Sequence, residues 1–88
     1  MSDKLKYIIT LDEAIIDRLE RAFAAHDKVS STSQDSGFWY SNGETGPEWF
    51  TVHVYFLKND EEAVRTHLEA CLKKAGTSAR LFLERDYS

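Results

Sequence analysis

The segment from Gly37 to Phe56 places the strongest constraint on the fold of this 88-residue chain. It holds seven of the eleven aromatic residues, in two runs separated by the turn-forming pairs Asn42-Gly43 and Gly46-Pro47. Two apolar runs around such turn residues predict a β-hairpin. A domain of this size buries only about 60 to 65% of the surface that its unfolded chain exposes. We therefore expect some of these rings to remain on the surface.

The rest of the chain alternates between strand and helix patterns. Apolar residues recur at every second position from Lys4 to Leu11, and at helical spacings after Asp12 and again after Asn59. These patterns predict strands at residues 4–11, 29–41, 49–58 and 78–86, and helices at residues 12–27 and 59–75. The polar stretch Val29 to Ser36 suits the start of an edge strand, with a low-complexity linker as the alternative.

The order β-α-β-β-α-β predicts a single α+β domain over residues 1–88 with a ferredoxin-like fold. In this fold, a four-stranded antiparallel sheet carries two helices on one face, with the first strand in a central position. The expected strand order is 4-1-3-2, and an order with the C-terminal strand displaced is the alternative.

Helix-end signals accompany both helix patterns. Asp12 or Thr10 can cap the first helix, and Asn59 with Glu62 has the spacing of a capping box for the second. Gly76 stands where a glycine that ends a helix is expected. The apolar stripes are Ile15, Leu19, Ala22, Phe23 and His26 in the first helix, and Val64, Leu68, Cys71, Leu72 and Ala75 in the second.

The hairpin divides its side chains between two faces. The second strand presents Phe50, Val52, Val54 and Phe56 to the core. The two turn pairs favour a wide loop over residues 42–47, and a symmetric loop would pair Phe38 with Thr51 and place Trp39 under the helices. The open face of the sheet would then hold Phe38, Tyr40, Trp49, Thr51, His53 and Tyr55, beside Ile8 and Phe82. A one-residue slip would exchange Trp39 for Phe38 and Tyr40 but leave Trp49 and Tyr55 there.

These open-face residues, with Glu44 and Glu48 of the hairpin loop, are the predicted partner-binding surface. Covering even three aromatic rings involves an area comparable with the largest apolar patch of a typical monomer. Tyrosine and tryptophan are also enriched at the centres of binding surfaces. The alternative is that Lys6, Arg80 and the polar stretch 30–36 fold over these rings, so that the sheet face is simply amphipathic.

The charge of the chain restricts the class of partner. A net charge of −4 is a poor match for nucleic acid, because nonspecific affinity comes from lysine and arginine releasing counterions. A protein with a basic surface is the better match. The lone Cys71 cannot form an intrachain disulfide, and the only apolar run near the N-terminus is short. We expect a cytoplasmic protein without a membrane span.

No residue pattern predicts catalysis, a cofactor or a metal ion. The histidines His26, His53 and His67 lack the spacings of metal sites, and one cysteine cannot build a zinc site. His26 and His67 fall at the edge of the core, whereas His53 is central on the open face. Cys71 lies on an apolar stripe, where a small buried side chain is the simplest interpretation.

Three functions remain open. The first is a noncatalytic protein interaction module, such as a small acidic inhibitor or modulator of a larger protein, with homodimerisation through the same face as a variant. The second is a homodimeric small-molecule-binding domain or enzyme, with Trp49, His53 and Tyr55 lining a pocket. The third is single-stranded nucleic-acid binding on the open sheet, which the lack of a basic, glycine-containing motif at Glu48–Phe56 disfavours.

Overall fold

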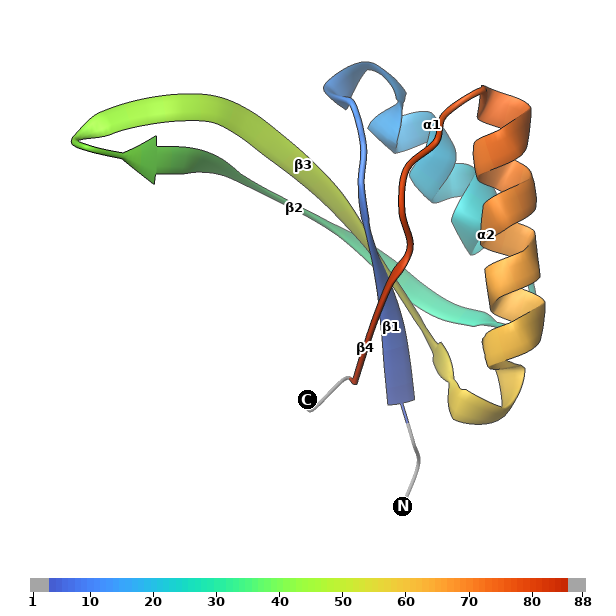
Figure 1. Ribbon diagram of the computed structural model, residues 1–88. Coiled ribbons are helices and arrows are strands. Elements are labelled where there is room, and N and C mark those ends of the chain that lie inside the picture. The colour runs from blue at the N-terminus through green and yellow to red at the C-terminus, as the bar shows by residue number, and fades with distance from the viewer. Residues whose placement is uncertain (1–3, 86–88) are drawn as a thin grey trace.

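The computed structural model describes residues 4–85 and has the predicted ferredoxin-like α+β architecture. Both helices lie on one side of a four-stranded antiparallel sheet of order β2-β3-β1-β4 (Figure 1). The predicted central position of β1 and the predicted strand order 4-1-3-2 are therefore confirmed. The elements are β1 (Lys4–Thr10), α1 (Glu13–Ala24), β2 (Val29–Ser41), β3 (Glu44–Leu57), a 3-10 turn η1 (Lys58–Asp60), α2 (Glu61–Ala75) and β4 (Phe82–Arg85).

The core lies between the sheet and the helices, as strand alternation predicts. Alternate residues of β1 and β3 are buried there, and Tyr7 stacks on Phe56 with ring centroids 5.1 Å apart. Phe23 of α1 and Leu68 of α2 are fully buried against them. The buried set is Leu5, Tyr7, Ile9, Leu11, Ile16, Leu19, Phe23, Val52, Val54, Phe56, Val64, Leu68 and Leu72.

The helices begin and end near the predicted residues, with two corrections. Asp12 is the N-cap of α1, but its side chain makes no capping hydrogen bond, and the buried stripe starts at Ile16 rather than Ile15. Asn59 is not the N-cap of α2, because it lies inside η1 and Asp60 takes that position. Gly76 ends α2 with φ 74°, a left-handed conformation that glycine adopts without steric cost, and this prediction is confirmed.

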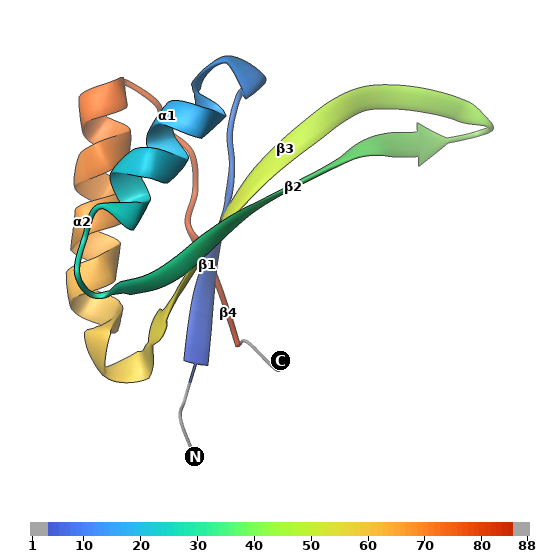
Figure 2. The same cartoon turned by 180° about the vertical axis from the view of Figure 1, so that it is seen from behind.

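Strands β2 and β3 extend well beyond the rest of the sheet (Figures 1 and 2). The pairing of β1 with β3 ends at Thr10 and Thr51, so the residues nearer the hairpin turn pair only with each other. We call residues 36–49 the arm. The views from front and back show it projecting away from both helices. The arm therefore has two exposed faces and two unpaired edges.

The turn of the arm is tight, which corrects the expected wide loop. Only Asn42 and Gly43 separate the strands, with φ values of 53° and 78°. Two successive residues with positive φ match the twist of a hairpin, and Asn-Gly is the pair that tolerates them best. The second turn pair, Gly46-Pro47, lies inside β3. These two residues stand opposite the single residue Trp39 of β2, so the extra residue forms a bulge in β3. A bulge accommodates proline because the ladder is interrupted there.

The tight turn also changes the register of the hairpin. Phe38 pairs with Glu48, three residues before the expected Thr51, and Gly37 pairs with Trp49. A shift by an odd number of residues moves every side chain of β2 to the other face of the sheet. The expectation that Phe38 and Tyr40 share the open face with Trp49 is therefore wrong. The side chain of Trp39 lies outside the described part of the structure.

The C-terminal strand is shorter than the sequence pattern predicts. β4 spans four residues, whereas the segment 78–81 that precedes it is irregular and Asp86 falls outside the described residues. Leu83 pairs with the core residue Tyr7 and so lies on the helix side of the sheet, yet it is 47% exposed. Within residues 4–85, neither helix has the length and apolar composition needed to cross a membrane.

Candidate functional site

The open face of the sheet is the side that neither helix covers. His53 and Tyr55 point to it from the middle of β3, and the register places Ile8 of β1 and Ser33 of β2 beside His53. At the β4 side, Phe82 pairs with Ile8 and is 63% exposed. This confirms the predicted alternation of β3, in which the residues between the core positions are turned away from the helices.

Polar side chains partly cover these rings. The ammonium group of Lys6 lies 5.9 Å from the ring centroid of Tyr55, within range of a cation–π contact. The Tyr55 hydroxyl is 3.5 Å from the hydroxyl of Ser33, and the rings of His53 and Tyr55 are 6.4 Å apart. Both ring side chains are half-buried rather than exposed. Lys6 and Ser33 lie beside Tyr55 as the amphipathic alternative expects of them.

Thr51 contributes little surface to the open face. Its side chain is only 8% exposed, and its hydroxyl donates a hydrogen bond of 3.4 Å to the backbone carbonyl of Asp35. The bond joins β2 to β3 at the base of the arm. Thr51 therefore acts as a structural link between the two strands in this structure.

Trp49 begins the aromatic surface of the arm. Its indole ring lies across Gly37 of β2, where an added Cβ would come within 2.8 Å of Cε2. Only glycine leaves room for the ring at this position, because every other residue carries a Cβ. The close contact explains why a glycine stands directly before the aromatic run of residues 38–40 in β2.

Phe38 and Tyr40 are the most exposed of the aromatic side chains of the arm that the structure describes. They are 59% and 72% exposed, and the register turns them to the face opposite Trp49. The arm therefore presents aromatic rings on both of its faces. Sequence reasoning identified these residues as surface aromatics but assigned them to the wrong side of the hairpin.

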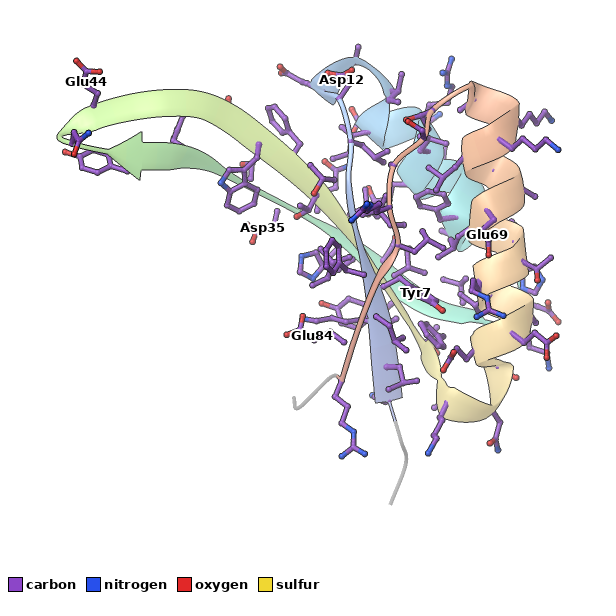
Figure 3. The ribbon with its side chains drawn as sticks, viewed as in Figure 1. Tyr7, Asp12, Asp35, Glu44, Glu69 and Glu84 are labelled. Carbon is purple, nitrogen blue, oxygen red and sulfur yellow. The ribbon has the colours of Figure 1, made fainter. Side chains whose placement is uncertain are left out.

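The hairpin carries acidic groups and no basic ones. None of the eleven lysine and arginine residues lies between Val29 and Leu57, whereas Asp35, Glu44 and Glu48 do. Figure 3 shows Glu44 at the tip of the arm and Asp35 near its base. Glu44 directly follows the turn and is the first residue of β3. The acidic residues that were expected in a loop therefore lie in a strand. Cationic groups of a partner would meet no like charge along β2 and β3.

A cleft of about 620 Å³ lies where the arm leaves the body of the protein. It is bounded by Glu48 and Trp49 of β3, by the end of β1 with the start of α1, and by residues 77–79 before β4. Sequence reasoning missed this cleft, because the three segments are far apart in the chain. Trp49 lines it, but His53 and Tyr55 do not.

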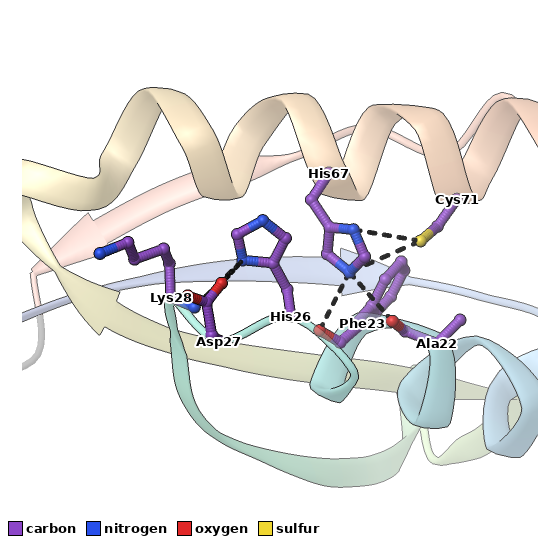
Figure 4. Close-up of polar contacts among 7 residues, drawn as sticks. All are labelled: Ala22, Phe23, His26, Asp27, Lys28, His67 and Cys71. Carbon is purple, nitrogen blue, oxygen red and sulfur yellow. Dashed lines mark hydrogen bonds and ion pairs between the residues drawn. The ribbon is translucent and has the colours of Figure 1, made fainter.

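His67 and Cys71 lie on the helical side of the molecule, at the junction of α1 and α2 (Figure 4). The His67 Nε2–H donates hydrogen bonds to the carbonyls of Ala22, at 2.9 Å, and Phe23, at 3.2 Å. This arrangement leaves Nδ1 as an acceptor for the thiol of Cys71, 3.9 Å away. Burial raises the pKa of that thiol, and nearby Lys74 opposes the shift. The prediction that His67 is a core-edge residue is confirmed.

The remaining ionisable residues do not form a metal site within residues 4–85. No group of three or more histidine, cysteine, aspartate or glutamate side chains there is arranged to hold a metal ion. Asp12 and Glu13 lie at the start of α1, and Glu61 and Glu62 at the start of α2, where a helix dipole favours negative charge.

The sequence matches no family model and no curated protein. Its fold is similar to solved structures. A DUF3240-family protein from Shewanella baltica is 16% identical with a TM-score of 0.72, covering 100% of this chain and 94% of that one. CutA from Synechococcus elongatus, complexed with Bis-Tris, is 9% identical with a TM-score of 0.69, covering 98% and 82%. Arabidopsis thaliana PII bound to citrate is 10% identical with a TM-score of 0.63, covering 98% and 91%. These likenesses show the fold alone.

Proposed function

We propose that the chain is a noncatalytic interaction module that binds a protein through the arm and the adjoining open face. The observation that carries this proposal is the exposure of Phe38 and Tyr40 on a ribbon that leaves the body of the domain. A two-stranded ribbon is only marginally stable by itself in water. The free energy is lowered when a second surface covers the large rings of such a ribbon and removes them from water.

The acidic character of the hairpin supports a basic partner surface. Asp35, Glu44 and Glu48 would attract cationic groups, and the absence of lysine and arginine from residues 29–57 removes the competing repulsion. Aromatic anchors surrounded by charged groups resemble the usual division of an interface into an apolar centre and a polar rim. We propose that the chain acts in this way as a small inhibitor or modulator of a larger protein.

A pull-down with matched variants tests the proposal. Phe38→Ser with Tyr40→Ser removes two rings from one arm face, and Trp49→Ala with Tyr55→Ala removes one ring from the other arm face and one from the adjoining open face. The control, Thr66→Ser with Ala70→Ser, changes exposed positions on α2. We expect at least one arm variant to lose partners that the control retains. Retention of the same partners by all folded variants would contradict the proposal.

Self-association through the same surface is a variant of this function. Light scattering with size-exclusion chromatography distinguishes it, because a second copy would make the measured mass depend on protein concentration. We then expect Phe38→Ser with Tyr40→Ser to restore the monomer mass. A wild-type chain that stays monomeric at high concentration would leave binding to a different protein as the function.

Small-molecule binding is a second candidate, favoured by the cleft at the base of the arm. Its volume of about 620 Å³ suits a small ligand. Bis-Tris is bound in the Synechococcus CutA structure and citrate in the Arabidopsis PII structure. Titration of either compound while following the fluorescence of Trp49 tests this candidate. If no ligand that is tried gives a saturable change in fluorescence, the cleft no longer supports small-molecule binding.

A further inference from the structure

A groove of about 580 Å³ runs between α1 and α2, on the side of the molecule away from the open face. Its walls are Leu19, Ala22 and Ala25 from α1 and the turn after it, and His67, Cys71 and Ala75 from α2. The volume falls in the range of small-molecule sites. The groove is separate from the partner-binding surface proposed above.

Helical spacing and small side chains explain why the groove is open. Residues 18, 22 and 25 lie on one stripe of the first helix, and residues 67, 71 and 74 lie on the facing stripe of the second. Alanine or cysteine occupies three of these six positions, 22, 25 and 71, so the facing side chains do not fill the space between the helices. His67 crosses the gap and bonds to the carbonyls of Ala22 and Phe23, which closes one end (Figure 4).

The groove has one charged end. The two helices run in opposite directions (Figures 1 and 2), so the last turn of α2 lies beside the first half of α1. Arg18 and Lys74 therefore line the end away from His67. Along the helix axis, Arg18 and Ala25 are roughly 10 Å apart. The groove thus offers two cations at one end and small apolar side chains along its length.

Among residues 4–85, these two cations lack carboxylate partners. Neither forms an ion pair with any carboxylate among residues 4–85, and no aspartate or glutamate lines the groove. The residues one turn before each of them, Ala14 and Ala70, cannot supply one. What distinguishes Arg18 and Lys74 is that both line one groove whose other walls are largely apolar. An anionic group is the complement that this end of the groove lacks.

We propose that the groove binds a small amphipathic carboxylate, such as a medium-chain fatty acid. The carboxylate would lie between Arg18 and Lys74, where charge-assisted hydrogen bonds fix its orientation. The aliphatic chain would follow Ala22 and Cys71 toward His67 and lose its contact with water. The two ends of the groove therefore select both features of the ligand, its charge and its apolar chain.

The single thiol of the chain provides a direct test, because Cys71 lines the groove. We expect octanoate to slow the reaction of Cys71 with a thiol reagent severalfold and saturably, and octanol to protect it much less. Replacing Arg18→Gln and Lys74→Gln should weaken protection by octanoate roughly tenfold or more. The matched control, Arg21→Gln with Lys73→Gln, removes the same charge from positions outside the groove and should protect like the wild type.

Three results would overturn the proposal. The first is no protection by millimolar octanoate, and the second is equal protection by octanol. The third is protection that rises with protein concentration alone, which would show that a second copy occupies the groove. Binding is also measured independently of the thiol, since octanoate should shift the methyl resonances of Ala22 and Ala75 in the wild type and in Cys71→Ala. Unshifted methyl resonances in the wild type would contradict binding in the groove even if the thiol were protected.

Discussion

The indole of Trp49 lies across the Cα of Gly37 on the neighbouring strand, which ties the two strands of the arm together. Substituting Gly37→Ala would place a Cβ within 2.8 Å of Cε2, so the ring must move out toward solvent. We expect a red shift of tryptophan emission in a Trp39→Phe background. Ser36→Ala, the adjacent change, should leave the emission unaltered, and an unshifted Gly37→Ala spectrum would show that the ring does not rest there.

Core and surface aromatics should differ sharply in their effect on stability. Phe56 is 1% exposed, and Phe56→Ala should lower the free energy of unfolding by about 3 to 5 kcal/mol. Phe82 is 63% exposed, so Phe82→Ala should change it by about 0.5 kcal/mol or less. Urea denaturation measures both values. A large loss for Phe82→Ala would mean that its ring packs against the sheet, contrary to the structure.

The bond between the two helices predicts a specific role for His67. Its Nε2–H is a shared donor to the carbonyls of Ala22 and Phe23. Substituting His67→Ala leaves these partly buried acceptors without that partner, and we expect a loss of about 1 to 3 kcal/mol in the free energy of unfolding. Thr66→Ala, one residue earlier and exposed, is the matched control and should cost about 0.5 kcal/mol or less. Equal losses of stability from the two substitutions would contradict a stabilising role for the hydrogen bonds of His67 to α1.

Tyr7 predicts how stability falls at alkaline pH. Burial against α2 (Figure 3), and to a smaller extent the nearby Glu61 carboxylate, raise the pKa of its hydroxyl above the ordinary value of 10.0. Its contribution to stability is complete below the pKa of the unfolded chain and is lost as pH rises through the higher pKa of the folded state. Above about pH 10, we expect the free energy of unfolding of Tyr7→Phe to fall less steeply with pH than that of the wild type. Parallel denaturation curves would show that Tyr7 does not contribute to the pH dependence.

The sequence was sufficient for the parts of the fold that local patterns determine. Alternation in Lys4–Thr10 identified the central strand, and the apolar stripe of α2 with Gly76 at its end identified the second helix. These signals are strong because burial on one face imposes a period of two or of 3.6 residues. The order of strands followed from the order of elements, since few arrangements cover one side of a sheet.

The register of the hairpin was predicted wrongly, because the expected wide loop combined the two turn pairs. Asn42-Gly43 alone forms the turn, as the preference of Asn-Gly for tight hairpin turns favours, whereas Gly46-Pro47 is accommodated in a bulge of β3. The error moved Phe38 and Tyr40 to the other face. The cleft at the base of the arm and the groove between the helices could not be predicted, since residues distant in the sequence form them.

Site-specific photo-crosslinking on the arm tests the central claim, that this ribbon is a docking surface, most directly. A photoreactive phenylalanine analogue replaces Tyr40, which is 72% exposed, and a matched variant carries it at Glu69, an exposed position on α2 (Figure 3). We predict discrete protein adducts from position 40, to a partner or to a second copy, that are absent from position 69. Equal yields from both positions, or no adduct from position 40, would contradict a docking role for the arm.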